Sequence, residues 1–296
     1  MNSFAINIKY ILLYILGGFF LSPYVLALDV IKANIGESTL DQRIHFKKQI
    51  LINALDLTKP KYGEYKIDIK KYYMNGERSF VELTKGKNIN VYFSLTQERM
   101  ERTAIPIRIP VRRGIVNYRL LLIKKGTENL FSDVNTLDDL KKIKVGIDTA
   151  WAAHKTLLYH DFNIAPVADY DSMFNMLARK RFKYIPRSIS EIYGEIDRHP
   201  DDFYNFAVEP SLVLYIPSAT YIFVSRESPR IADRLKEGLE MMVENGDLLK
   251  VFNRFFSDSI EKSDVRNRKI IYIDNPYLPS SVPVSNKNLW FSPENY

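Results

Sequence analysis

Short apolar segments with strand-like spacing alternate with longer amphipathic segments along most of the chain, and this alternation constrains the fold more than any other feature. Residues 30–35 predict a short strand, and apolar side chains recur at helical spacing over residues 40–55. Residues 65–70 alternate apolar with charged side chains, as in a half-buried strand. Strands and helices in this order are typical of mainly parallel sheets with helices on both faces. The expected fold class is therefore α/β.

The pattern breaks near residue 110. Pro106, Pro110 and Gly114 precede an unbroken apolar stretch at residues 118–123, which is typical of a strand buried on both faces. A boundary between two lobes is therefore expected at this break.

A second series of strands and helices follows. Thr136 and Asp139 predict a capping box that opens a helix, and the alternation continues to residue 196. Apolar strands at residues 212–216 and 221–224 are separated by a Pro-Ser-Ala segment, which predicts a return crossing. We therefore expect two lobes joined by two hinge strands. Residues 28–112 and 218–270 form the first lobe, and residues 113–217 form the second. Residues 271–296 form a C-terminal tail, which is either a surface strap or a frayed end.

Residues 1–27 have the pattern of a secretory signal peptide. Lys9 precedes an apolar stretch at residues 10–21, and the small residues ahead of position 28 fit the signal peptidase. This pattern predicts cleavage after Ala27 and a periplasmic location for the mature chain. The alternative is an uncleaved membrane anchor, which the Gly-Gly and Ser-Pro pairs in this segment disfavour.

The composition excludes several kinds of chemistry. The 296 residues include no cysteine, which removes disulfides, thiolate metal sites and a cysteine nucleophile. The four histidines lack metal-motif spacing, and no phosphate-binding loop, dinucleotide fingerprint or nucleophile elbow is present. We therefore expect no metal and no cofactor. The net charge of +7 favours anionic partners, but the short basic clusters at 179–181 and 266–269 indicate solvated faces rather than a nucleic-acid site.

Several short motifs occur in an informative order. They are Ser94-Leu95-Thr96-Gln97-Glu98-Arg99, the apolar strand at 118–123, and residues 136–141, 144–147 and 170–172. In order and spacing, over roughly residues 30–257, this series is similar to the extracellular solute-binding protein family 3, the polar amino-acid binders of bacterial uptake systems. Residues 105–110, 182–187 and 275–276 resemble a less characterised branch of that family.

The resemblance implies a type II periplasmic binding protein. In such a protein two α/β lobes, with mixed sheets flanked by helices, are joined by two hinge strands and close on a small solute. The resemblance does not imply catalysis.

The resemblance also implies a carboxylate site in the first lobe. In the family an arginine that follows a Ser-x-Thr segment grips the ligand carboxylate, because a guanidinium donates two parallel hydrogen bonds. Arg99 has that position, and Ser94 and Thr96 would donate to the same group. The alternative interpretation of Arg99 is a surface arginine at a helix start.

Thr149 and Trp151 are expected at the start of the helix that follows residues 144–148. Backbone amides at that helix start would bind the anion from the opposite lobe, and Trp151 would stack on the ligand. The alternatives are that Thr149 is an ordinary N-cap for a helix beginning at Ala150, and that Trp151 is simply packed.

Arg187 is a departure from the family. The familiar amino-acid binders place an aspartate for the ligand ammonium after the strand near residue 182, whereas this chain has Arg187. The reversed charge favours an anionic solute such as a dicarboxylate, and the alternative is that Arg187 pairs with a protein acid such as Glu191. Glu37 stands where amino-acid binders often carry an aromatic residue, and it either accepts from an amino or hydroxyl group of the ligand or is a solvated loop acid.

We therefore expect a monomeric periplasmic solute-binding protein, not an enzyme, that captures a small polar, carboxylate-bearing solute for an ABC-type uptake system with an inner-membrane permease. Two alternatives remain. One is a ligand-sensing partner of a membrane receptor that uses the same cleft. The other is a periplasmic dehydratase-like enzyme, for which Glu37 is the candidate general acid or base.

Overall fold

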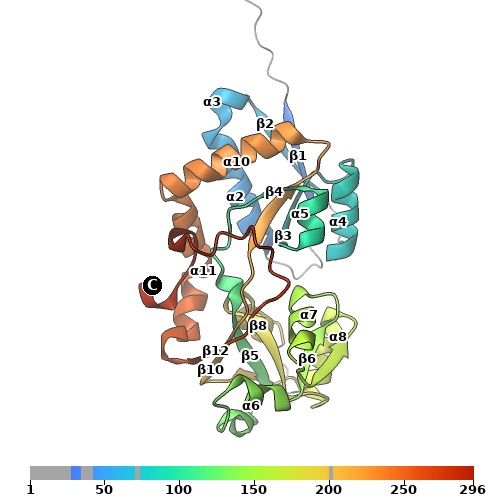
Figure 1. Ribbon diagram of the computed structural model, residues 1–296, viewed down its shortest axis with the longest axis vertical. Helices are drawn as coiled ribbons and strands as arrows, with labels where there is room; N and C mark the ends of the chain where they lie inside the picture. The colour runs from blue at the N-terminus through green and yellow to red at the C-terminus, as the bar shows by residue number, and fades with distance from the viewer. Residues whose placement is uncertain (1–27, 35–42, 71–73, 200–202) are drawn as a thin grey trace, which may run out of the picture.

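The computed structural model describes residues 28–34, 43–70, 74–199 and 203–296. The predicted signal peptide lies outside these residues. Figure 1 shows two α/β lobes stacked along the long axis of the molecule. The expected fold class is confirmed, because parallel and antiparallel strands flanked by helices form each lobe. In the described part of the chain, no helix combines the length and the apolar character needed to cross a membrane.

The first lobe contains two sheets that meet at Asn90. In one, β1 (Asp29–Asn34) is parallel to β2 (Tyr65–Lys70); in the other, β11 (Thr220–Val224) lies antiparallel between β3 (Val91–Leu95) and β4 (Ile105–Ile107). The Asn90 side chain accepts from the backbone N–H of Lys32 at 2.7 Å and donates to the carbonyl of Val30 at 2.9 Å, which joins β1 to the start of β3. The helices of this lobe are α2 (Arg43–Leu57), α3 (Lys59–Tyr62), α4 (Gly76–Lys85), α5 (Glu98–Thr103) and α10 (Pro229–Glu244).

The second lobe contains a single seven-stranded sheet. Its central strand β5 (Tyr118–Lys124) is antiparallel to β8 (Tyr184–Ser188), β9 (Phe206–Val208) and β10 (Leu212–Tyr215). On the far side of β8, β6 (Val145–Asp148) is parallel to both β8 and β7 (Ile164–Val167). The helices of this lobe are α6 (Leu137–Lys142), α7 (Ala152–Tyr159), α8 (Tyr170–Ala178) and α9 (Ile189–Asp197).

Two further elements connect the lobes or extend them. Helix α11 (Asp247–Ser263) contacts α2 and α10 of the first lobe and α9 of the second. Strand β12 (Lys269–Tyr272) pairs in parallel with β10 at the edge of the second-lobe sheet, although the sequence placed these residues at the end of the first lobe and in the tail. Short 3-10 turns complete the fold: η1 (Ile115–Asn117), η2 (Glu128–Phe131), η3 (Val265–Asn267), η4 (Lys287–Leu289) and η5 (Pro293–Asn295).

The two crossings between the lobes are hydrogen-bonded to each other. Asn117 Oδ1 accepts from Ser218 N at 2.9 Å and from Ser218 Oγ at 2.6 Å, and Asn117 O accepts from Ile216 N at 2.9 Å. Gly114, at a φ of 72°, begins the first crossing beneath the ring of Trp290, which would lie 2.5 Å from a Cβ atom at this position. Glycine is therefore required there by both conformation and space.

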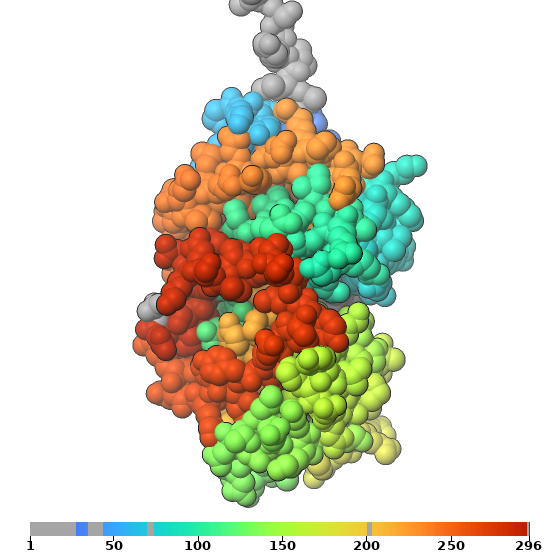
Figure 2. Space-filling view, viewed as in Figure 1, coloured from blue at the N-terminus to red at the C-terminus, as the bar shows by residue number. Residues whose placement is uncertain are grey.

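Residues 273–296, here called the strap, run from the end of β12 across the front of the molecule and over both lobes (Figures 1 and 2). Val282, Leu289 and Phe291 in this segment are buried. The strap is therefore packed against the body of the protein.

Two local predictions about helix starts have different outcomes. The capping box of Thr136 and Asp139 is confirmed, and it opens α6. The prediction that Thr149 caps a helix beginning at Ala150 is wrong, because α7 begins at Ala152 with Trp151 as its N-cap residue. The Asp148 carboxylate accepts from the backbone N–H of Ala150 at 2.8 Å, which folds the segment into a turn before the helix can begin.

Candidate functional site

The candidate site in the second lobe lies on the hinge side of its sheet. Strand β5 begins at the hinge and pairs Arg119 with Ser188 at the end of β8. Because β6 is parallel to β8, its end lies on the same side of the sheet. The starts of α7 and α9 are therefore brought to the edge that faces the first lobe.

Arg187 is buried at this edge, and its charge is neutralised within the protein. Its guanidinium lies 4.3 Å from the ring centre of Trp151, and its Nε donates to the two oxygens of Glu195 at 2.8 and 3.0 Å. Tyr170 Oη donates to the same carboxylate at 2.7 Å, and Glu191 forms a second ion pair with Arg187 at 3.0 Å. The structure thus contains the pair with Glu191 that the sequence offered as an alternative, together with the pair with Glu195, which the sequence did not suggest.

The environment of Arg187 keeps its guanidinium charged. Burial on its own would lower the pKa of Arg187, but the carboxylates of Glu195 and Glu191 outweigh burial and raise that pKa above its usual value. The hydrogen bonds and ion pairs of Arg187 described above use its Nε and Nη2, so these two nitrogens are committed to the protein.

Arg119 is a second buried arginine, and no ion pair joins it to a carboxylate among the described residues. It is 7% exposed, and its Nε has no hydrogen-bond partner among the described residues. The pKa of Arg119 is lowered to about 10, mainly by burial; Glu191 acts to raise this pKa, and Arg187 and Arg112 act to lower it. Arg112 itself donates to Ser190 Oγ at 2.6 Å and lies 3.6 Å from Glu191.

Among the described residues, positively charged groups predominate in this cluster. The N-terminus of α9 adds a partial positive charge, and its N-cap Ser188 accepts from the backbone N–H of Ser190. A buried charge without a partner is strongly unfavourable, so an anion is the natural complement of this cluster. In the part of the chain that the structure describes, the cluster contains the guanidiniums of Arg112, Arg119 and Arg187 and the carboxylates of Glu191 and Glu195.

Sequence reasoning missed Arg119 because residues 118–123 predict a buried strand. The sequence did contain a signal for Arg119, because this arginine stands within a strand that is predicted to be buried. An arginine is almost never fully buried unless it is paired, so its position there indicates a binding partner. Arg119 therefore joins the predicted residues as part of the candidate site.

In the first lobe, Arg99 lies in the first turn of α5, beside the start of α4. Its Nη2 donates to the two carboxylate oxygens of Glu77 at 2.8 and 2.7 Å, and its guanidinium lies 4.6 Å from the ring centre of Phe80. The Arg99 side chain remains 56% exposed. In this state the position expected to hold a ligand carboxylate is occupied by a carboxylate of the protein.

Thr96 and Ser94 lie just ahead of Arg99. Thr96 is buried, and its hydroxyl donates to Glu101 at 2.7 Å. Glu101 also accepts from Arg108 at 2.9 Å and from Ser281 of the strap at 2.8 Å. The Thr96 hydroxyl is therefore committed to the protein, whereas half-buried Ser94 lies within β3 and pairs with Tyr221 of β11.

The structure brings together Trp151 and Arg187 in the second lobe, while Ser94, Thr96 and Arg99 form a separate group in the first. No hydrogen bond or ion pair between described residues joins the two groups. Figure 1 shows α4 and α5 above α7 and α8, on the same side of the molecule.

Two predicted residues remain apart from these groups. Thr149 is exposed beyond the end of β6, and its backbone N–H donates to Val167 O at 3.1 Å. Glu37, named both as a ligand contact and as the acid or base of the enzyme alternative, lies outside the described residues. In the described ranges, no cluster of histidine and acidic side chains could hold a metal ion.

Two α/β lobes joined by two crossings define the fold of the two-lobed periplasmic binding proteins. An ancestral arginine-binding protein bound to arginine is similar at 17% identity and a TM-score of 0.55, over 77% of this chain and 98% of that one. A second similar structure, from Streptococcus mutans, is described for glutathione import through GshT and the cystine importer TcyBC. It has 10% identity and a TM-score of 0.57, and the match covers 78% of this chain and 96% of that chain. A histidine kinase sensor domain with similarity to periplasmic binding proteins matches at 13% identity and a TM-score of 0.55, and the match covers 77% of this chain and 95% of that chain. No protein-family model and no curated protein matches the chain. The resemblance noted in the sequence is thus confirmed at the level of the fold.

Proposed function

We propose that this chain is a periplasmic protein that binds a small carboxylate-bearing solute between its lobes and delivers it to an inner-membrane uptake system. The observation that carries the binding role is the two-lobed architecture, because ligand sites occur preferentially between domains. The similar structures named above include a protein bound to arginine and one described for glutathione import, which supports a small polar solute.

The charge of the second-lobe cluster supports an anionic solute. Arg119 offers a buried guanidinium whose Nε has no hydrogen-bond partner among the described residues, and the guanidiniums of Arg112 and Arg187 add positive potential around it. A solute carboxylate at this edge of the sheet supplies the missing negative charge and a hydrogen-bond acceptor.

The first lobe supplies a second guanidinium through an exchange of partners. Arg99 and Glu77 form an exposed ion pair, and such pairs contribute at most about 1 kcal/mol. A solute carboxylate can therefore replace Glu77 on Arg99 at small cost, and lobe closure then holds the solute from both sides.

Replacing Arg119 with methionine is expected to weaken solute binding without destabilising the protein. A hydrogen bond to a charged group contributes about 1.5–3 kcal/mol, which corresponds to roughly a tenfold to hundredfold loss of affinity. Methionine fills a similar volume and removes a buried charge that has no ion pair among the described residues, so the free energy of unfolding should stay constant or rise. Isothermal titration of residues 28–296 with succinate, glutarate, citrate and L-glutamate measures the affinity, and urea unfolding measures the stability.

Arg102→Met is the matched control for this experiment. Arg102 lies on α5 with a 79% exposed side chain, so its replacement should change neither quantity. A large loss of stability in Arg119→Met with unchanged affinity would show that Arg119 is structural. Mass spectrometry of the solute retained by the purified protein would identify the natural ligand directly.

Glu77→Gln is expected to strengthen binding of the same carboxylate by up to about fivefold, because the neutral amide competes less well for Arg99. Arg99→Ala should weaken binding in the same titration. Glu82→Gln, on the same helix but paired with Lys85, is the control. Equal affinities in the wild type, Glu77→Gln and Arg99→Ala would remove Arg99 from the proposed site.

Ligand sensing for a membrane receptor is a second candidate function. The strap favours it, because a segment packed over both lobes links any lobe movement to an exposed surface that a receptor could contact. The similar sensor domain of a histidine kinase belongs to this functional class. Uptake of the labelled solute by cells that lack this chain separates the two functions, since a transport role predicts loss of uptake and a sensing role predicts normal uptake.

A further inference from the structure

The strap is attached to both lobes and to the second crossing. In the second lobe, Thr156 Oγ1 donates to Asn275 Oδ1 at 3.0 Å. The Asn275 amide in turn donates to the carbonyl of Pro217 in the second crossing at 2.8 Å. In the first lobe, Ser281 Oγ donates to Glu101 at 2.8 Å. The strap therefore has a defined path over the hinge.

The end of the strap is attached to the first crossing. Arg113 Nη1 donates to Asn288 O at 2.8 Å, and Arg113 O accepts from Phe291 N at 2.6 Å. The Phe291 ring lies 5.3 Å from that of Tyr118, and Trp290 lies over Gly114. Both crossings thus pass beneath the strap.

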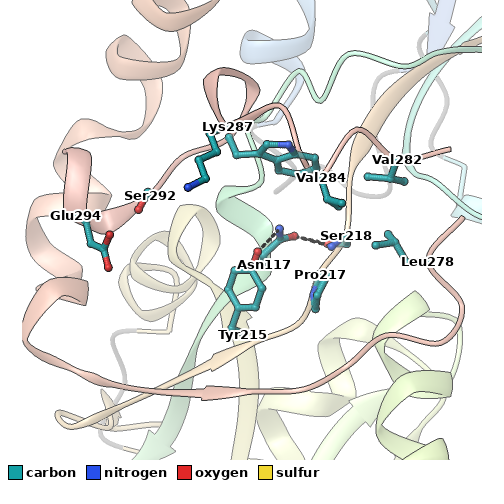
Figure 3. A pocket seen from close by; sticks show the side chains of 11 residues that line it. Asn117, Tyr215, Pro217, Ser218, Leu278, Val282, Val284, Lys287, Ser292 and Glu294 are labelled. Carbon is teal, nitrogen blue, oxygen red and sulfur yellow. Dashed lines mark hydrogen bonds between the residues drawn. The ribbon is translucent and has the colours of Figure 1, made fainter. Parts of the chain in front are cut away.

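A cavity of ≈ 280 Å³ lies between the strap and the hinge, and we call it the hinge cavity (Figure 3). Asn117, Ser218 and Tyr215 from the hinge and β10 line one part of it, and the strap lines the remainder. Its volume is slightly below the 300–1,000 Å³ of typical ligand pockets, which favours a small molecule of about amino-acid size. None of the predicted ligand-binding residues lines it.

The apolar and charged side chains of the hinge cavity are segregated. Figure 3 shows Leu278, Val282 and Val284 on one side, and Lys287 and Glu294 on the other. An occupant of this cavity therefore needs an apolar part at one end and a polar part at the other.

The two charged groups are available to a ligand. The Lys287 ammonium and the Glu294 carboxylate form no ion pair with each other, and neither makes a hydrogen bond or ion pair with any other described residue. Together they can bind one anionic and one cationic group at the same end of a small molecule.

The geometry points to the hinge cavity as a second ligand site, which binds a small zwitterion with an apolar side chain. Lys287 binds the carboxylate of the zwitterion, Glu294 binds its ammonium, and the valine side of the cavity covers the apolar group. Because both crossings and the strap form the walls, occupancy of this site is linked to the hinge. The inference does not depend on the solute proposed for the cleft between the lobes.

The two tryptophans of the chain allow each site to be observed separately, since Trp290 lines the hinge cavity and Trp151 lies on Arg187 in the candidate cleft. The protein, ¹⁵N-labelled and comprising residues 28–296, is titrated with L-leucine while the two indole N–H signals are recorded, and Trp151→Phe assigns them. The Trp290 signal is expected to shift and the Trp151 signal to stay in place. Isoamylamine and 4-methylpentanoate, which each lack one charge, should bind at least about tenfold more weakly.

Lys287→Ala and Glu294→Gln should each weaken L-leucine binding by about tenfold or more, whereas Lys236→Ala, an exposed lysine on α10, should leave it unchanged. Three results would overturn the inference: no shift of either signal, a shift of the Trp151 signal alone, or equal affinity in the wild type, Lys287→Ala and Glu294→Gln. A shift of the Trp151 signal alone would place the amino acid in the cleft, so this result would leave the proposed binding function intact.

Discussion

Replacing Glu195 with glutamine is expected to lower the free energy of unfolding by about 3 kcal/mol or more, because removal of one partner from a buried ion pair leaves the other uncompensated. Glu195 is buried and accepts both from Arg187 and from Tyr170. In the variant, Arg112, Arg119 and Arg187 would share the single carboxylate of Glu191. Urea unfolding at pH 7, followed by circular dichroism, measures this change.

Glu191→Gln is the matched control, since Glu191 also pairs with Arg187 but its side chain is 18% exposed. Its effect should be clearly smaller than that of Glu195→Gln. The double variant Arg187→Met with Glu195→Met should recover much of the lost stability, because it removes both charges and keeps the volume apolar. If Glu195→Gln costs less than about 1 kcal/mol, the size of an exposed ion pair, Arg187 is not committed to Glu195 and is free to meet a ligand.

The fold could be predicted because its determinants are local and repeated. Alternating strand and helix patterns indicate an α/β architecture wherever they occur, and Thr136 with Asp139 opens α6 through contacts within one turn. The strand β12 could not be predicted in its place, because its pairing with β10 joins residues more than fifty positions apart.

The candidate site was harder to predict, because its chemistry depends on partners that the sequence does not place. Arg187 is neutralised mainly by Glu195, eight residues further on, and this contact depends on the turn between β8 and α9. Arg99 was identified by its motif, but its pairing with Glu77 requires α4 and α5 to lie side by side. Thr149 does not cap α7, because the Asp148 carboxylate accepts from the backbone N–H of Ala150 and the helix begins only at Ala152.

Replacing Arg234 with methionine is expected to lower the free energy of unfolding by about 3–5 kcal/mol, the range observed when one partner of a buried pair is removed. Arg234 is fully buried on α10, and its Nη1 donates to Asp29 on β1 at 2.8 Å. Its Nη2 donates to the carbonyls of Gly63 at 2.7 Å and of Leu55 at 3.2 Å. Methionine leaves these acceptors without a donor in the interior of the first lobe, and thermal unfolding followed by circular dichroism should show a midpoint lowered by roughly 10 °C.

Arg230→Met separates burial from charge as the cause of this effect. Arg230 lies one turn before Arg234 on α10 and donates to the same Asp29 at 3.1 Å, but its side chain is 43% exposed. Water can replace the exposed donor, so its loss should cost no more than about 1 kcal/mol. In Arg234→Met, Asp29 still has Arg230 as a partner. A large loss of unfolding free energy in this variant must therefore come from the buried carbonyls as well as from the lost ion pair. Equal destabilisation by the two variants would mean that the charge of Asp29, rather than the buried hydrogen-bond network around Arg234, holds α10 against the strands and helices of the first lobe.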